Sequence, residues 1–388
     1  MEQDGIIPSV NILTNYSTSA MDEADEQMGK KLAILLLTIT VLIGLSAWYI
    51  VGGIQAYSRY QQSSIASQEH CGGQLPVHIC VQSPFEIFSA YYPFYLATQS
   101  NLFIIHYSSS SPITLVMSVN IAGFSQVETH TVNATTNAQS ISFMPLVMNQ
   151  VLRQLTADDN TLLQVHVRDT TGHEYYVNDS PLLLRSRWLM RWIAANRLMI
   201  AAWVTPDDPA VRVLVSKAVA HLQLEPSPTP AAMIGYANRA STRAVRDQVD
   251  AIFDAMRLDY QIRYIQASVP YIGPGDNSMA LQHIKLPAEV MQQRSGMCIE
   301  LTALLASAVE HIGLHAEIVI IPGHAFLGVA VTQNDSQFEY WDAVQVNSNV
   351  AGDSANLWAD YEYKQNAGQI VDTIVISDAR KQGVGPML

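Results

Sequence analysis

The sequence is short of cysteine, of charge and of motifs that bind cofactors. It has three cysteines in 388 residues, and charged residues make up 14% of the chain. It contains no zinc-finger spacing, no glycine-rich phosphate loop, no EF-hand loop and no HExxH metalloprotease motif. We therefore expect neither a metal ion nor a nucleotide or other cofactor.

Basic residues are also scarce relative to acidic ones. The chain has 21 lysines and arginines against 34 acidic residues, for a formal net charge of −13. No basic stretch interleaved with aromatic residues occurs. Because an acidic surface repels phosphate backbones, we expect no nucleic acid partner.

Apolar residues, in contrast, are plentiful. They make up 49% of the chain, which supports sizeable hydrophobic cores and argues against wholesale disorder. The length is enough for two domains.

The three cysteines are unevenly spaced. Cys71 and Cys80 lie close together, whereas Cys298 stands alone far downstream. This pattern fits one disulfide between Cys71 and Cys80 and one reactive thiol at Cys298. Since His70 and His78 lie beside the first pair, free thiols or a metal site there are alternatives, although no spacing is typical of zinc. Three buried, inert thiols are a further alternative.

A long apolar run occurs near the N-terminus. Residues 32–50 read LAILLLTITVLIGLSAWYI, and no charge occurs between Lys31 and Arg59. About 20 apolar residues cross a bilayer as a helix, so we predict a transmembrane helix over residues 31–54. The acidic leader argues against a cleaved signal peptide. Because two lysines precede the run and one arginine follows it, we predict a single-pass protein with a cytoplasmic N-terminus and extracytoplasmic C-terminal domains.

The rest of the chain divides by pattern. Residues 1–30 form an acidic tail and residues 55–75 a polar stalk. Short runs of period-two alternation, separated by turn residues, predict an immunoglobulin-like β-sandwich over residues 76–187, serving as a spacer or docking module. Residues 188–388 combine helical spacing with later strands and predict an α+β domain.

The residues after Cys298 predict a helix. Ser295 and Gly296 form a tight turn, so Cys298 falls at the helix N-terminus, and Gly313 follows the last turn. The positive end of the helix dipole favours the thiolate, which is the nucleophilic form, and free N–H groups there can stabilise an oxyanion. One face of this helix is apolar: Leu301, Leu304, Leu305, Ala308, Val309 and Ile312.

Two further groups follow on predicted strands. His324 comes directly after Pro322 and Gly323 and opens one strand, and Asp342 lies near the end of the next, in FEYWDAV. We predict that Cys298 is a nucleophile, that His324 is its general base, and that Asp342 orients the imidazole.

These motifs resemble those of bacterial transglutaminase-like domains, whose core is shared with papain-type cysteine proteases. The resemblance covers most of residues 200–380 and is carried by G-x-C-x-E, an apolar helix ending in Gly-Leu, a strand, GHAF and an aromatic-Asp step. QHIKLPAEVM and AAWVTPDDPAV look similar to the same group. The family usually has aspartate two residues after the cysteine, where this chain has Glu300.

The resemblance implies a fold and an oxyanion-hole residue. The implied fold is α+β: a transglutaminase-like or papain-like core, with the helix of the catalytic cysteine packed on an antiparallel sheet. The immunoglobulin-like β-sandwich and one transmembrane helix would precede this core. Gln282 and Gln292 are the candidates for a side-chain amide in the oxyanion hole; Gln292 lies six residues before Cys298, as in papain.

The implied chemistry is acyl transfer from a protein or peptide amide. We expect a membrane-anchored cysteine peptidase or amidase that acts on extracytoplasmic proteins. A protein-cross-linking transamidase is an alternative, and a non-catalytic envelope adhesion or assembly module is an alternative of another class.

Overall fold

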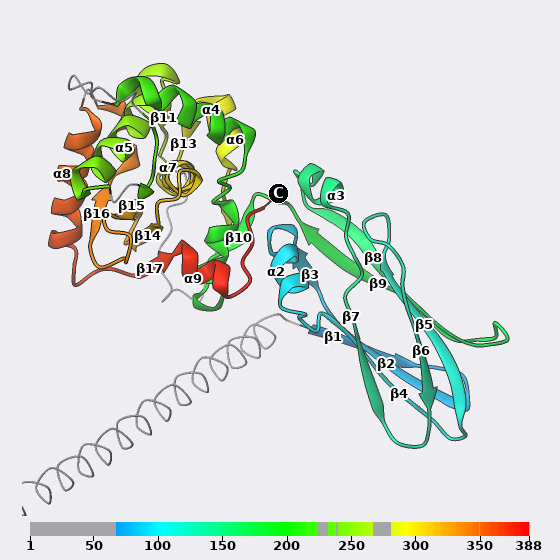
Figure 1. Ribbon diagram of the computed structural model, residues 1–388. Coiled ribbons are helices and arrows are strands. Elements are labelled where there is room, and N and C mark those ends of the chain that lie inside the picture. Colours follow the sequence, from blue (N-terminus) through cyan, green and yellow to red (C-terminus); the bar gives the residue numbers. More distant parts are fainter. Residues whose placement is uncertain (1–66, 223–231, 238–239, 267–280, 349, 388) are drawn as a thin grey trace, which may run out of the picture. The chain divides into compact units, whose positions relative to one another are not determined.

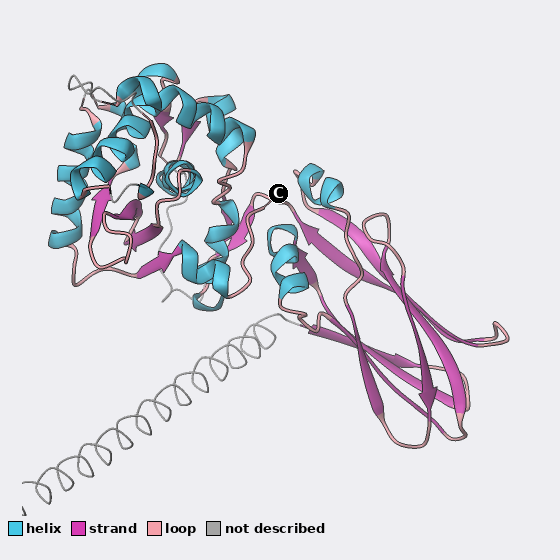
Figure 2. Cartoon of the chain, in the orientation of Figure 1, coloured by secondary structure: helices cyan, strands magenta, loops and turns pink. Residues whose placement is uncertain are grey.

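The computed structural model describes residues 67–222, 232–237, 240–266, 281–348 and 350–387. They fall within one compact unit of the chain, residues 60–388. Strands predominate up to residue 191, and helices alternate with short strands after it (Figures 1 and 2).

Two sheets make up the first part. One has the strand order β1-β2-β4-β7 and the other β3-β9-β8-β5-β6. Neighbouring strands are antiparallel, except for the parallel pair of β3 and β9. Contacts of β2 with β9 and of β4 with β6 join the sheets. The strands are β1 (Ser67–Gly72), β2 (Val77–Pro84), β3 (Glu86–Phe88), β4 (Phe103–Ser109), β5 (Ile113–Ile121), β6 (Glu128–Ala134), β7 (Gln139–Phe143), β8 (Asp159–Asp169) and β9 (Glu174–Arg185).

Alternation of apolar and polar residues explains these strands. In β5, Leu115, Met117, Val119 and Ile121 are fully buried, while the residues between them are partly exposed. Period-two burial of this kind places every second side chain in the core. Strand β1 lies within the segment predicted to be a stalk, so the first sheet begins earlier in the chain than predicted.

The second part is built around α7 (Cys298–His311) and a four-stranded antiparallel sheet of order β16-β15-β14-β17. Helix α7 contacts β14 and β15, and α8 (Gly352–Gln365) contacts β16. All six residues of β14 are buried, as expected for a strand covered on both faces. The strands are β14 (Ala316–Ile321), β15 (His324–Ala330), β16 (Phe338–Trp341) and β17 (Asp372–Val375).

Shorter elements complete this part. β10 pairs with β12, and β11 pairs with β13 in parallel. The 3-10 helix η6 (Ala343–Asn347) follows β16. The others are β10 (Leu189–Arg191), η2 (Ala194–Trp203), α4 (Pro209–Ala218), α5 (Thr242–Asp254), β11 (Arg263–Tyr264), β12 (Leu281–His283), α6 (Pro287–Gln293), β13 (Ser295–Gly296) and α9 (Ile376–Lys381).

Helix α7 is more enclosed than its apolar face predicts. Every residue from 299 to 309 is buried, and α4, α5 and α6 contact the helix in addition to the sheet. Small residues outside the predicted stripe, such as Ala303, Ala306 and Ser307, allow this close approach.

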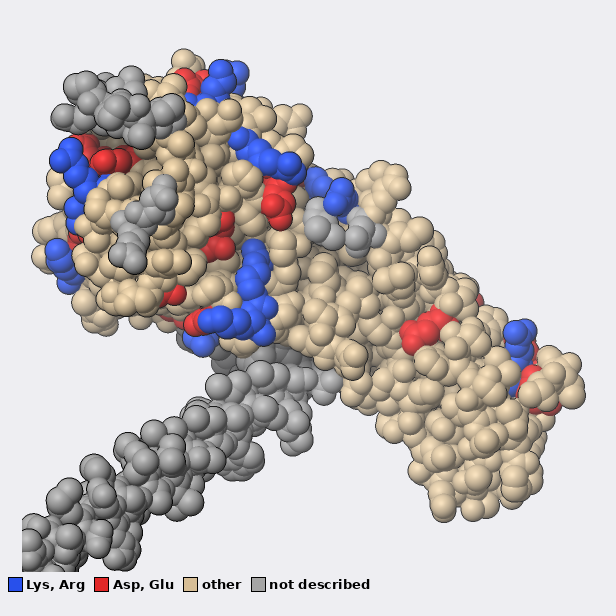
Figure 3. All heavy atoms as spheres, in the orientation of Figure 1, with Lys and Arg blue, Asp and Glu red and all other residues tan. Residues whose placement is uncertain are grey.

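Charge is thinly spread over the surface. On the face drawn in Figure 3, most acidic and basic side chains lie over the second part, close to one another, and the two-sheet part is largely uncharged. This distribution agrees with a chain in which only 14% of residues are charged.

The predicted membrane anchor is wrong for the described part of the chain, in which no helix is long and apolar enough to cross a membrane. The predicted span, residues 31–54, lies outside the described residues, as do the tail (1–30) and most of the stalk. This finding corrects the predicted fold class, which included a transmembrane helix. It equally corrects the predicted membrane partner and the single-pass location with a cytoplasmic N-terminus and extracytoplasmic domains.

Candidate active site

Cys298 is the first residue of α7 and is partly buried. Met297 before it is extended, with φ −75° and ψ 169°, so the helix begins abruptly. Ser295 and Gly296, predicted to be a tight turn, form the short strand β13 instead, and a Cβ atom at Gly296 would lie 2.9 Å from the Leu301 side chain. The backbone N–H groups of the first helical turn have no intrahelical acceptor, so they are available beside the thiol.

Glu300 holds the start of α7 from inside the protein. Its side chain is fully buried. One carboxylate oxygen accepts the N–H of Met297 at 2.9 Å, and the other accepts the N–H of Lys285 at 2.8 Å. Lys285 Nζ lies 3.5 Å from Glu300 Oε2. Glu300 is therefore a buried cap of the helix that carries Cys298.

His324 and Asp342 meet at one end of the four-stranded sheet. His324 opens β15 after the turn at Gly323, whose φ of +77° favours glycine. Asp342 follows β16, is 1% exposed, and accepts the N–H of Val344 at 3.1 Å and an amide N–H of Gln345 at 3.3 Å. His324 Nε2 lies 3.1 Å from Asp342 Oδ1. A fixed carboxylate thus orients the imidazole and leaves Nδ1 for another partner.

The surroundings of His324 favour its protonated form. Burial by itself lowers the pKa of His324, but hydrogen bonds to Asp342 and Cys298, with the negative charges of both, raise it to about 10. The structure therefore brings Cys298, His324 and Asp342 together. A thiol, an imidazole and a carboxylate in this order are the groups that an activated cysteine nucleophile uses.

A pocket opens beside these residues. Its cavity volume is about 60 Å³, and Cys298, His324, Trp192, Tyr264 and Gln282 are among the residues that line it. The lining mixes apolar side chains with a few polar groups, which is typical of sites that bind small groups in a defined orientation.

The structure separates the two glutamine candidates. Gln282, on β12, lines the pocket with Cys298. Gln292, on α6, is exposed and does not line this pocket. The papain-like interval before the cysteine was therefore a poor guide to which amide lies near Cys298.

A second carboxylate, which no sequence pattern singled out, also lies beside His324. Glu362 is on α8, and its Oε2 atom is 3.8 Å from His324 Nε2. That oxygen is buried and has no hydrogen-bond partner among the described residues. Burial, and then the charge of Asp342, raises the pKa of Glu362.

Comparisons with known proteins do not assign the chain to a family. No family model and no curated protein matches it. One solved structure, the exo-chitosanase CsxA of Amycolatopsis orientalis, is 8% identical, with a TM-score of 0.19 over 63% of this chain and 31% of that chain. A second, of the exo-β-D-glucosaminidase CsxA, is 9% identical with the same TM-score and coverage. This chain therefore spans 31% of the length of each of these matches.

The predicted fold class needs a second correction. Nothing in the comparisons supports a transglutaminase-like or papain-like label, so that label is not retained for the fold, and the described residues are α+β. A TM-score of 0.19 carries no argument about substrate or reaction. The resemblance seen in the sequence motifs stays a prediction.

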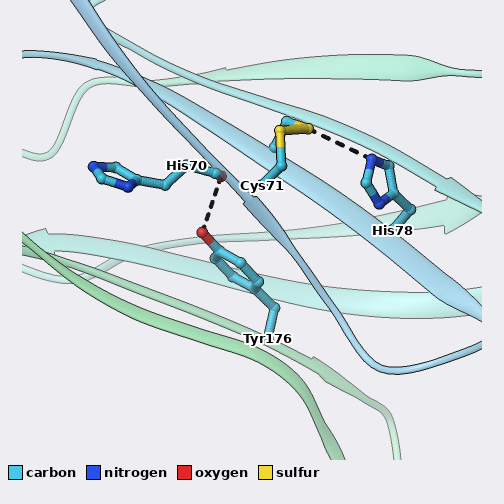
Figure 4. Close-up of a disulfide and its surroundings, with 5 residues drawn as sticks. His70, Cys71, His78 and Tyr176 are labelled. Carbon is cyan, nitrogen blue, oxygen red and sulfur yellow. Dashed lines mark hydrogen bonds between the residues drawn. A yellow bond between two sulfur atoms is a disulfide. The ribbon is translucent and has the colours of Figure 1, made fainter.

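The other two cysteines lie in the two-sheet part. Cys71 and Cys80 are opposite each other on β1 and β2 and are joined by a disulfide (Figure 4). His78 Nε2 lies 3.6 Å from Cys80 Sγ, whereas His70 accepts a hydrogen bond at its carbonyl oxygen from the Tyr176 hydroxyl at 3.1 Å. The cluster considered from the sequence is thus a disulfide with one neighbouring histidine.

Proposed function

We propose that this chain is a cysteine acyl-transfer enzyme, a hydrolase or acyltransferase, acting on amide bonds of proteins or peptides. The observation that supports the proposal is the grouping of three side chains: Cys298 and His324 line one pocket, and Asp342 lies behind His324. Cys298 is at a helix N-terminus, His324 pairs with it, and Asp342 holds the far side of the imidazole at 3.1 Å. These are the groups that a nucleophile, its general base and an orienting carboxylate require.

In the first step, the Cys298 thiolate attacks the amide carbonyl carbon and forms a carbon–sulfur bond. The carbonyl oxygen gains negative charge, which the N–H of Cys298 and the side-chain amide of Gln282 are placed to stabilise. His324 then donates its Nδ1 proton to the leaving amine as the carbon–nitrogen bond breaks.

In the second step, neutral His324 takes a proton from water or from an acceptor amine. That acceptor attacks the thioester, the carbon–sulfur bond breaks and the thiolate returns. Asp342 keeps Nε2 protonated throughout, so that the acid and base chemistry takes place at Nδ1.

The proposal predicts rapid alkylation of Cys298. Iodoacetamide should label Cys298 quickly near neutral pH, and His324→Ala should slow the labelling about tenfold or more. The reason is that a loss of about 1.4 kcal/mol in thiolate stabilisation changes its population tenfold. Labelling is followed by intact mass over time.

His315→Ala is the matched control for that experiment. His315 also pairs with a carboxylate, Asp335, at 2.6 Å, but it precedes β14 at the end of the strand away from His324. Its replacement should leave the labelling rate unchanged. Equally slow labelling of the unaltered protein and of both variants would contradict the proposed activation.

The oxyanion role of Gln282 can be tested separately. Gln282→Ala should lower kcat by about 10²–10³-fold, because removing one oxyanion donor has that effect in other enzymes. Gln292→Ala, which changes an exposed residue on α6, should keep nearly the full rate. Initial rates on a fluorescent peptide amide measure both, and equal losses would exclude a special role for Gln282.

A further inference from the structure

His324, Asp342 and Glu362 form a group of three potential metal ligands. Each offers one ligand atom, and the three atoms lie within 4.8 Å of one another. The residues come from β15, from the end of β16 and from α8, so three separate elements bring them together. The proposed catalytic chemistry uses His324 and Asp342 but gives Glu362 no role.

The distances suit a zinc ion. Zinc binds imidazole nitrogen and carboxylate oxygen at about 2.1 Å, so two ligands at a tetrahedral angle lie about 3.4 Å apart. His324 Nε2 is 3.1 Å from Asp342 Oδ1 and 3.8 Å from Glu362 Oε2. A movement on the order of 1 Å in the partly exposed Glu362 side chain would complete the three-ligand set.

The polar groups around this set also favour a cation. Glu362 Oε2 is buried without a hydrogen-bond partner among the described residues, and the His324 ring lies 3.8 Å from it. Two carboxylates neutralise one divalent cation. Asp342 is also held from behind by Val344 and Gln345, and such outer partners orient a metal ligand.

We propose that His324, Asp342 and Glu362 bind a divalent transition-metal ion of the zinc class, and that this ion reversibly inhibits the enzyme. The ion takes Nε2 of His324, and water fills the fourth position. Binding moves one proton from Nε2 to solvent, and the ring keeps its last proton on Nδ1.

The proton that stays on Nδ1 of His324 explains why the bound ion would inhibit the enzyme. The metal-bound ring would have to become an imidazolate to protonate the leaving amine, and it cannot accept another proton at Nδ1 while one is already there. Asp342 is also taken from its orienting role. The inhibition rests on the proposed acyl transfer, whereas the binding of the ion does not.

Outside the disulfide region, the other histidines of the described residues that pair with a carboxylate have fewer potential metal ligands. His130 with Glu128, His166 with Glu174, His221 with Asp259 and His315 with Asp335 each supply one carboxylate. Two-ligand sites bind zinc more weakly than three-ligand sites, so the proposed site should stand out in a titration.

The test uses the full chain with Cys298→Ser, prepared without reductant. The Cys71–Cys80 disulfide then stays closed, and no thiol remains to bind the ion. Zinc is titrated by calorimetry, and cobalt(II) by visible absorption. We expect one ion per chain and a tetrahedral cobalt spectrum without a thiolate charge-transfer band.

Two variants decide where the ion binds. Adding Glu362→Gln should weaken zinc binding about tenfold or more, and adding His324→Ala should abolish the site. Asp378→Asn, which changes an exposed carboxylate on α9, should bind as tightly as the parent. Equal affinity in the Glu362→Gln and Asp378→Asn proteins, or no site in the Cys298→Ser parent, would overturn the proposal.

A last measurement separates this proposal from the proposed function. In the protein with Cys298 intact, zinc should stop amide turnover, and Glu362→Gln should raise the zinc concentration needed about tenfold. Zinc binding at Glu362 without any amide turnover would contradict the enzyme function alone. Turnover that zinc leaves unaffected would contradict the regulation alone.

Discussion

Replacing Cys298 by serine should abolish amide turnover. We expect a fall on the order of 10⁴-fold or more, as is seen when a triad nucleophile is removed. The serine hydroxyl has nearly the shape of the thiol but is a far weaker nucleophile at neutral pH. The assay combines a fluorescent glutamine-containing peptide with a labelled amine, so that cleavage and amine transfer are both seen.

The matched control replaces both of the other cysteines. Cys71→Ser with Cys80→Ser removes two sulfur atoms where Cys298→Ser removes one, but in the sheet of β1 and β2. That double variant should keep its turnover, provided that circular dichroism shows it folded. Full activity of the Cys298→Ser protein would falsify the assignment of the nucleophile.

Replacing Glu300 by alanine should destabilise the protein by about 3–5 kcal/mol. Removing one partner of a buried, hydrogen-bonded charge pair has this cost, because the remaining groups stay buried without compensation. The change leaves the N–H groups of Met297 and Lys285 without their acceptor, and the Lys285 ammonium without its neighbouring carboxylate. Urea unfolding followed by fluorescence measures the loss.

Two further variants serve as controls for the Glu300→Ala measurement. Glu300→Gln keeps an acceptor oxygen and should lose less stability than Glu300→Ala. Asp378→Ala changes an exposed carboxylate and should stay within about 0.5 kcal/mol of the unaltered protein. If Glu300→Ala costs no more than Asp378→Ala, Glu300 is not the cap that its hydrogen bonds indicate.

The helix and strands of the candidate site could be located from the sequence. The apolar spacing after Cys298 and the glycine after it mark α7, and the Pro-Gly step marks the start of β15, whereas the turn predicted at Ser295 and Gly296 is the short strand β13. These signals act over a few residues, since periodicity and turn conformation depend on local sterics.

The sequence did not predict how completely α7 is buried, nor which of the two glutamines lies near Cys298. The stripe on α7 predicts one buried face, yet α4, α5 and α6 enclose the helix. Gln282 and Gln292 are chemically identical, and only the placement of β12 beside the pocket separates them.

The sequence by itself determined where Cys298, His324 and Asp342 stand within their own elements, because caps, turns and strand alternation depend on neighbours in the chain. Only the tertiary structure decided that Cys298 and His324 line one pocket with Asp342 behind the imidazole, that Glu300 caps α7, and that Glu362 joins His324 from α8. Contacts between side chains that are far apart in the sequence depend on how the helices and the sheet pack, and this packing depends on the whole chain.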